Sequence, residues 1–203
     1  GVEEVRERWC AVHQKKTESQ LLMFFWYPLL KVTHINTLAH QRQKYPDHEP
    51  IAFERLVIHR ALKLSMTVER YPAKEDCWKG YTVGSVRYLN YSQWMPEQEF
   101  NYIEELLRFS RYSKARAKGD DRMWKIRDLF ESLQEVIHSS LPRFGRSAVV
   151  DEIRFFFSGR APCMKHMETK PIEDGWTLWA AACCRRGSMF DIYTWYNLIL
   201  KDT

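Results

Sequence analysis

The sequence predicts an α+β fold, in which a helical N-terminal region, residues 1–141, precedes a small antiparallel sheet in residues 142–203. Before Pro142 most apolar side chains recur every three to four positions, the period of a helix with one buried face. Beyond Arg146 the pattern changes to extended apolar runs, which are typical of strands. A chain of 203 residues, 45% of them hydrophobic, is long enough to bury a core for one domain or two small ones.

The helical region divides at its prolines and polar stretches. The segment Leu21 to Tyr27 fits either a buried strand or a helix, and Pro28 is expected to end it. Acidic residues directly after Pro96 favour a helix start, because they interact well with the helix dipole. The predicted helices are residues 2–16, 51–71, 96–108 and 120–141, the last capped by Asp120.

Three strands are predicted in the C-terminal region, at Ser147 to Phe157, Trp176 to Cys183 and Met189 to Trp195. The last two are separated by Arg185 to Ser188, a connection whose length and glycine suit a hairpin. Consecutive strands with so short a connection pair in the antiparallel sense.

Positive charge is concentrated in one segment. The formal net charge is +5 and the pI is near 8.9, too mild an excess to indicate nucleic-acid binding by itself. Residues 108–118 nevertheless hold five cations and no acid, so they account for the whole net charge. Such a segment can follow a phosphate backbone, or it can be a solvated loop, the more common role of a charge run. These five cations are Arg108, Arg111, Lys114, Arg116 and Lys118.

Other function classes find little support. The five cysteines form an odd set without a Cys-x-x-Cys motif, which fits neither a disulfide framework nor a zinc cage and favours a reducing compartment. The apolar run Leu21 to Leu30 is ten residues long and contains Pro28, so it is too short to span a membrane. The sequence has no glycine-rich phosphate loop and no serine nucleophile elbow, and no partner pattern assigns a role to its histidines.

Several short motifs follow one another between Met95 and Gly175. The first is a helix with Met95, Phe100 and Ile103 followed by Leu-Leu-Arg-Phe at residues 106–109. The second, and the most specific, is Asp-Asp-Arg-Met-Trp-Lys-Ile-Arg at residues 120–127. The later, shorter matches are Asp151-Glu152 on a strand, Gly159-Arg160, Lys170-Pro171 and Gly175. Each short piece is weak alone, but together and in this order they resemble the piggyBac transposable element-derived domains.

The resemblance implies a fold, a partner and a metal ligand. The sheet would be the opening antiparallel strands of a truncated RNase H-like domain, and Asp151 would occupy the position of the family's first catalytic, metal-binding carboxylate. DNA would be the partner, with Arg160 and Lys170 joining the five cations of residues 108–118 as contacts. Two Mg²⁺ ions in such a site need several convergent carboxylates, so Asp151 alone binds a metal only weakly.

Three functions remain open at this point. The chain ends at Thr203, before the family's later aspartates, so the first is a domesticated domain that is catalytically inactive in this form, retains DNA binding and requires no cofactor. The second is a piece of an active DDE/DDD-type transposase that uses Mg²⁺ and is completed by downstream sequence. The third is an interaction module that pairs with a protein partner or with itself through the edge at Met189 to Trp195. The expected location is nuclear or cytoplasmic, without a membrane partner.

Overall fold

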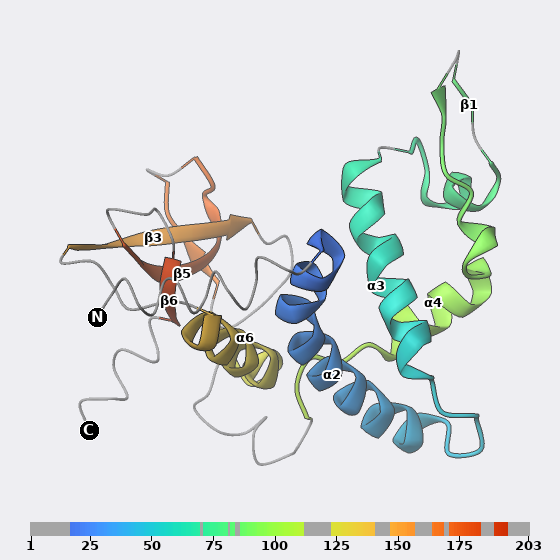
Figure 1. Ribbon diagram of the computed structural model, residues 1–203, viewed down its shortest axis with the longest axis horizontal. Coiled ribbons are helices and arrows are strands. Elements are labelled where there is room, and N and C mark those ends of the chain that lie inside the picture. The colour runs from blue at the N-terminus through green and yellow to red at the C-terminus, as the bar shows by residue number, and fades with distance from the viewer. Residues whose placement is uncertain are drawn as a thin grey trace. The chain divides into compact units, whose positions relative to one another are not determined.

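The computed structural model (Figure 1) describes residues 17–69, 71–80, 82–83, 86–111, 123–140, 147–156, 164–168, 171–183 and 189–194. Its architecture is α+β, as the sequence predicts, and the predicted helices and strands that fall among the described residues follow in the predicted order. The helix predicted at residues 2–16 lies outside the described residues. By its contacts the chain divides into two compact units, one comprising Leu30–Arg111 and the other Gly1–Leu29 with Tyr112–Thr203. We call them the helical unit and the sheet unit. The boundary expected near residue 141 stays a prediction.

The helical unit is built on α3 (Phe53–Val68), α4 (Glu97–Leu106) and the later part of α2 (Glu18–Lys44). Two short 3-10 helices, η1 (Lys74–Trp78) and η2 (Tyr91–Gln93), and the two-residue strands β1 (Thr82–Val83) and β2 (Val86–Arg87) connect α3 to α4. This connection matches the loop that the sequence predicts after Asp76, apart from these short elements.

The core of the helical unit follows the helical period that the sequence shows. Buried residues lie three positions apart on α3 and again on α4, so each helix contributes one face. The ring of Phe100 packs edge-on against Trp78, whose indole nitrogen donates a 2.8 Å hydrogen bond to the carbonyl of Met95. The side chains buried most completely in this core include Leu56, Tyr91, Met95, Phe100, Ile103 and Leu106.

Helix α2 differs from the prediction, because it continues through Pro28 to Lys44. A proline inside a helix removes one backbone hydrogen bond, at a cost of about 3 kcal/mol. Burial of the helix beyond it offsets this cost, since Leu30 and four polar residues after it are almost fully buried at helical spacing. Because that face is largely polar, hydrophobic periodicity does not reveal it. The polar residues are Thr33, Asn36, Thr37 and Gln41.

The sheet unit contains β3 (Ala148–Phe156), β4 (Lys165–His166), β5 (Asp174–Cys183) and β6 (Met189–Thr194). Strand β5 pairs antiparallel with β3 from Gly175 opposite Phe156 to Cys183 opposite Ala148. It also pairs antiparallel with both β4 and β6, which therefore share its other side. The three long strands confirm the predicted ones, while the connection from Arg185 to Ser188 lies outside the described residues.

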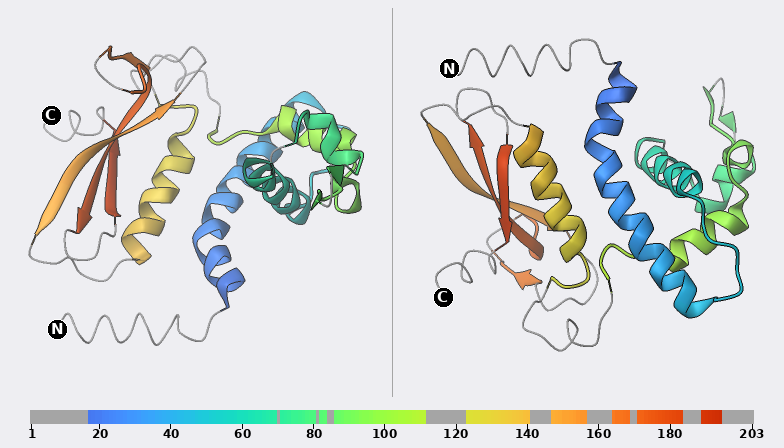
Figure 2. Two further views of the ribbon diagram at one scale, coloured as in Figure 1. Left: turned by 90° about the horizontal axis from the view of Figure 1, so that it is seen from above. Right: turned by 60° about the horizontal axis from the view of Figure 1, so that its bottom comes forward.

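Helix α6 (Arg127–Ser140) lies along one face of this sheet (Figure 2). Its apolar positions Phe130, Leu133 and Ile137 pack with Ala180 and its neighbours Trp176 and Leu178 on β5. These β5 residues are two apart, so the strand's alternation directs all of them to the helix. Turn residues 123–126 precede α6, and Asp120, the predicted cap, lies outside the part of the chain that is described.

A close backbone approach explains the glycine of the family-like motif at residue 175. A Cβ atom added to Gly175 would lie 2.3 Å from the carbonyl oxygen of Phe155 on the adjacent strand β3. Any side chain at this position would therefore push β3 and β5 apart where they begin to pair.

Candidate nucleic-acid interface

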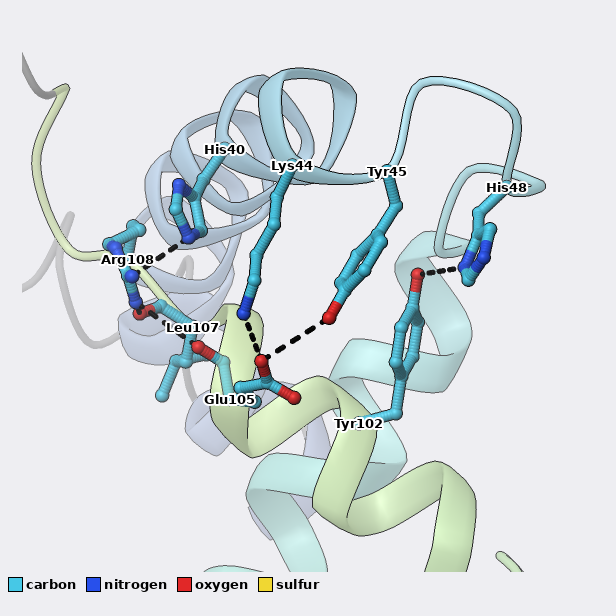
Figure 3. Close-up of polar contacts among 8 residues, drawn as sticks. All are labelled: His40, Lys44, Tyr45, His48, Tyr102, Glu105, Leu107 and Arg108. Atoms are coloured by element: carbon cyan, nitrogen blue, oxygen red, sulfur yellow. Dashed lines mark hydrogen bonds and ion pairs between the residues drawn. The ribbon is translucent and has the colours of Figure 1, made fainter.

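Polar side chains gather where the end of α2 meets the end of α4 in the helical unit (Figure 3). On α2, His40 and Lys44 are one helical turn apart and therefore project from the same face. Helix α4 ends because Leu107 leaves the helical conformation, with ψ at 128°. We call the group drawn in Figure 3 the Arg108 cluster: His40, Lys44, Tyr45, His48, Tyr102, Glu105, Leu107 and Arg108.

Arg108 joins the two helices. Its Nη1 donates to the carbonyl oxygens of Leu107, at 2.7 Å, and Glu105, at 3.3 Å, where α4 ends. Its Nη2 lies 2.8 Å from Nε2 of His40 on α2. A cation bound to the last carbonyls of a helix is favoured by the helix dipole as well as by the hydrogen bonds.

The contact with Arg108 fixes the protonation of His40. A guanidinium has donors only, so Nε2 of His40 must accept, which makes the ring neutral with its proton on Nδ1. Burial, followed by the charges of Arg108 and Lys44, lowers the pKa of His40 below its ordinary value. Both considerations describe an uncharged histidine beside two cations.

One carboxylate balances part of this charge. Glu105 accepts hydrogen bonds from Lys44 and from the hydroxyl of Tyr45, the latter at 3.4 Å. The hydrogen bond and charge of Lys44 lower the pKa of Glu105, and the same hydrogen bond raises the pKa of Lys44. Both side chains are about half exposed, so water screens the pair and its contribution to stability is small.

An aromatic group completes the cluster. The rings of Tyr45 and His48 are stacked with centroids 4.8 Å apart, and Tyr102 on α4 lies beside both. The Tyr102 hydroxyl receives a 3.1 Å hydrogen bond from Gln41 and is 2.9 Å from Nδ1 of His48. Gln41 also accepts from the backbone N–H of Ile51, so the turn after α2 is fastened to α4.

The predicted cation segment continues beyond Arg108 to Arg111, the last residue of the helical unit. Phe109 is half-buried and lies beneath the guanidinium of Arg60, whose carbon is 5.8 Å from the ring centroid. Ser110 is buried, whereas Arg111 is exposed. Thus the first two cations of the segment differ in environment: Arg108 is half-buried at two helix ends, and Arg111 faces solvent.

The other five predicted DNA contacts lie outside the described part of the chain. Lys114, Arg116 and Lys118 follow Arg111 outside the described residues, as do Arg160 and Lys170 in the sheet unit. Pro171, the second residue of the Lys-Pro motif, is described and exposed. The structure therefore brings only Arg108 and Arg111, among the seven predicted DNA contacts, into the described part of the chain.

Asp151, the predicted metal ligand, lies in the middle of β3 opposite Ala180. Its side chain is exposed, and Oδ1 accepts a 2.7 Å hydrogen bond from the backbone N–H of Glu152. Successive residues of a strand point to opposite faces, so Glu152 cannot join Asp151 on one ion. Among the described residues no three His, Cys, Asp or Glu side chains are grouped as metal ligands. The described surroundings of Asp151 therefore do not fit a two-metal centre.

The sequence reasoning missed the α2 side of the cluster. Thr37, His40 and Lys44 have the spacing of one helix face, which would have been the signal. The sequence patterns predict no helix over residues 31–44, so this spacing does not stand out from the sequence alone. Tyr102, on the correctly predicted α4, carries no sequence signal of its own.

The fold is that of part of a piggyBac transposase. A cryo-EM structure of a piggyBac transposase synaptic complex with hairpin DNA matches this chain with a TM-score of 0.67 and 14% sequence identity. The match covers 84% of this chain and 37% of that one, so the chain spans little more than a third of the relative's length.

The chain belongs to the transposase family described as Transposase IS4, whose sequence profile matches residues 19–196. With the structural match, this establishes a piggyBac transposase-derived domain, as the motifs predict. No curated protein matches the chain significantly. None of the described helices is long and apolar enough to cross a membrane.

Proposed function

We propose that this domain binds the phosphate backbone of duplex DNA through the cations of residues 108–118 and does not cut DNA by itself. The observation that carries the proposal is the exposure of Arg111 where this acid-free segment leaves the helical unit, in a chain of a transposase family. Backbone contacts by lysine and arginine release counterions and need no base-specific geometry. The binding would therefore depend strongly on salt and little on DNA sequence.

The charge of the segment sets the size of the salt effect. Each cation of the segment that neutralises a phosphate should add about −0.9 to the slope of log K against log salt, so the five cations set a limit of about −4.5. Fluorescence anisotropy of a labelled duplex, titrated with the full chain between about 50 and 200 mM salt, measures this slope. A binding constant that does not change with salt would contradict the proposal.

A triple variant locates the interaction. Arg111→Ala, Lys114→Ala and Arg116→Ala together should make the slope shallower by about 2.7, because three phosphate contacts are lost. The matched control replaces three exposed cations elsewhere with alanine and changes the net charge equally. If the control has the same effect, the segment has no special role. The control residues are Lys31, Arg42 and Lys125.

The second part of the proposal, that the domain does not cut DNA by itself, rests on the surroundings of Asp151. Its carboxylate is exposed on β3, but the described residues around it do not provide the further ligands that two divalent ions need. Incubating supercoiled DNA with the chain and Mg²⁺ or Mn²⁺ tests this part of the proposal. Strand cleavage that Asp151→Ala abolishes would overturn it.

A second candidate is that the chain forms part of a longer, active transposase. The coverage of 37% of the piggyBac transposase chain favours it, because further carboxylates could then come from additional sequence. Metal-dependent cleavage by a version extended with the downstream reading frame, lost in Asp151→Ala, would support this candidate. A domesticated role without cleavage implies instead a nuclear protein. Imaging of the tagged chain in cells tests this location.

A further inference from the structure

We propose that Arg108 is a positioning residue and not a phosphate ligand: it anchors residues 107–110 so that Arg111, the next cation, faces the DNA. This inference rests on the proposed DNA binding and assigns different roles in it to Arg108 and Arg111. The sequence treats Arg108 and Arg111 as equivalent members of one charge run. Their surroundings in the structure separate them.

The guanidinium of Arg108 already has protein acceptors. Nη1 donates to the carbonyls of Glu105 and Leu107, and Nη2 donates to His40 (Figure 3). These contacts use three of the five N–H donors of the guanidinium and hold it at the negative end of α4. A phosphate bound there would meet the negative end of the helix dipole, which opposes an anion.

The backbone at Arg108 is anchored as well. Its N–H donates a 3.2 Å hydrogen bond to the hydroxyl of Thr37, a side chain that is completely buried in the helical unit. Beyond it, Phe109 packs under Arg60, and Ser110 is buried. Burial lowers the pKa of Arg60, which agrees with a cation covered by protein at this point.

Together these contacts hold residues 107–110 and make Arg111 the first exposed cation of the segment. An anchored segment loses less conformational freedom on binding than a free one, so the anchor should strengthen binding without touching DNA. Loss of the anchor should therefore weaken affinity while the number of phosphates neutralised stays the same.

Charge-conserving variants separate an anchor from a ligand. A lysine can still meet a phosphate, but it cannot replace the planar fork that contacts two carbonyls and a histidine. We expect Arg108→Lys to bind duplex DNA roughly fivefold to tenfold more weakly than wild type, and Arg111→Lys to bind nearly as well as wild type. The salt slope should stay unchanged in Arg108→Ala and become shallower by about 0.9 in Arg111→Ala.

Thr37→Val tests the same anchor without any change of charge. Valine matches threonine in shape but lacks the hydroxyl that accepts from the Arg108 N–H, so this variant should also weaken binding with an unchanged salt slope. Hydrogen exchange of the full chain provides a readout that does not involve DNA. Amides 108–111 should exchange roughly tenfold faster in Arg108→Lys and in Thr37→Val, and at the wild-type rate in Arg111→Lys.

The outcomes are distinct. A shallower slope in Arg108→Ala equal to that in Arg111→Ala, or wild-type exchange and affinity in Arg108→Lys, would overturn the inference. If the wild-type chain binds no DNA, the proposed function fails, and the exchange rates alone decide whether Arg108 anchors the segment. Faster exchange in Arg108→Lys then supports the anchor, and unchanged exchange excludes it.

Discussion

Acid should weaken the helical unit through one buried histidine, His59. Its side chain on α3 has no exposed surface, and its ring centroid lies 4.4 Å from that of Phe100. Nε2 is 2.9 Å from Oε2 of Glu104, whose other oxygen accepts a 2.7 Å hydrogen bond from Lys63. Burial, together with the charges of Arg60 and Lys63, lowers the pKa of His59 to about 4, although Glu104 acts in the opposite direction.

The lowered pKa sets both the sign and the size of the effect. The unfolded chain binds a proton at this histidine below its ordinary pKa of 6.5, whereas the folded chain does so only near pH 4. The stabilisation is thus complete above pH 6.5 and is lost as the pH falls toward 4. One pKa unit corresponds to 1.36 kcal/mol, so the free energy of unfolding should decrease by about 2 kcal/mol between pH 7 and pH 5 because of His59.

Urea unfolding followed by far-ultraviolet circular dichroism at pH 7, 6 and 5 measures this loss. The variant His59→Leu removes the titrating group and should abolish about 2 kcal/mol of the pH dependence. The control His166→Leu, at a side chain that is 54% exposed in the sheet unit, should keep it. His59→Gln serves if leucine prevents folding. A wild-type pH dependence in both His59 variants would refute the reasoning.

Three further substitutions test contacts inside the helical unit or inside the sheet unit, and each is measured as the free energy of unfolding in urea. Phe100→Ala in the core of the helical unit should cost about 3–5 kcal/mol, while Val68→Ala, at a side chain that is 77% exposed, should change stability little; equal effects would contradict the core described here. Gly175→Ala should cost about 1–3 kcal/mol, since the new Cβ meets the carbonyl of β3 at 2.3 Å, and wild-type stability would show that the strands adjust freely. Arg55→Lys should cost about 1 kcal/mol, because Nε and Nη2 of the guanidinium both donate to Glu99 and a lysine cannot make both hydrogen bonds. Wild-type stability in Arg55→Lys would contradict this role of the paired contact.

A hydrophobic period that agrees with burial makes a helix predictable from the sequence. Helix α4 was expected from Pro96 onward and spans Glu97–Leu106, with Phe100, Ile103 and Leu106 buried at the helical period. Pattern and tertiary environment therefore favour the same structure in this helix. The long strands were predicted from extended apolar runs alone, since Val149, Val150 and Phe156 on β3 are exposed.

The second half of α2 shows where the pattern fails. Its buried face carries Thr33, Thr37 and Gln41, which a hydrophobic period does not detect. Their burial is possible because partners from other segments accept or donate hydrogen bonds, such as the N–H of Arg108 for Thr37 and that of Ile51 for Gln41. Pro28 likewise predicts an end that the packing of the later helix overrides.

By itself the sequence determined the α+β class and the positions of the three long strands along the chain. It also determined the ends of α3 and α4 to within a few residues, and the transposase family. These follow from local periodicity and from motifs that are contiguous in the chain. Only the tertiary structure decided what the individual charges do, because their partners are distant in sequence. Arg108 contacts His40 and Thr37, 68 and 71 positions away, and this separation turns one member of a uniform charge run into a helix anchor while Arg111 stays exposed.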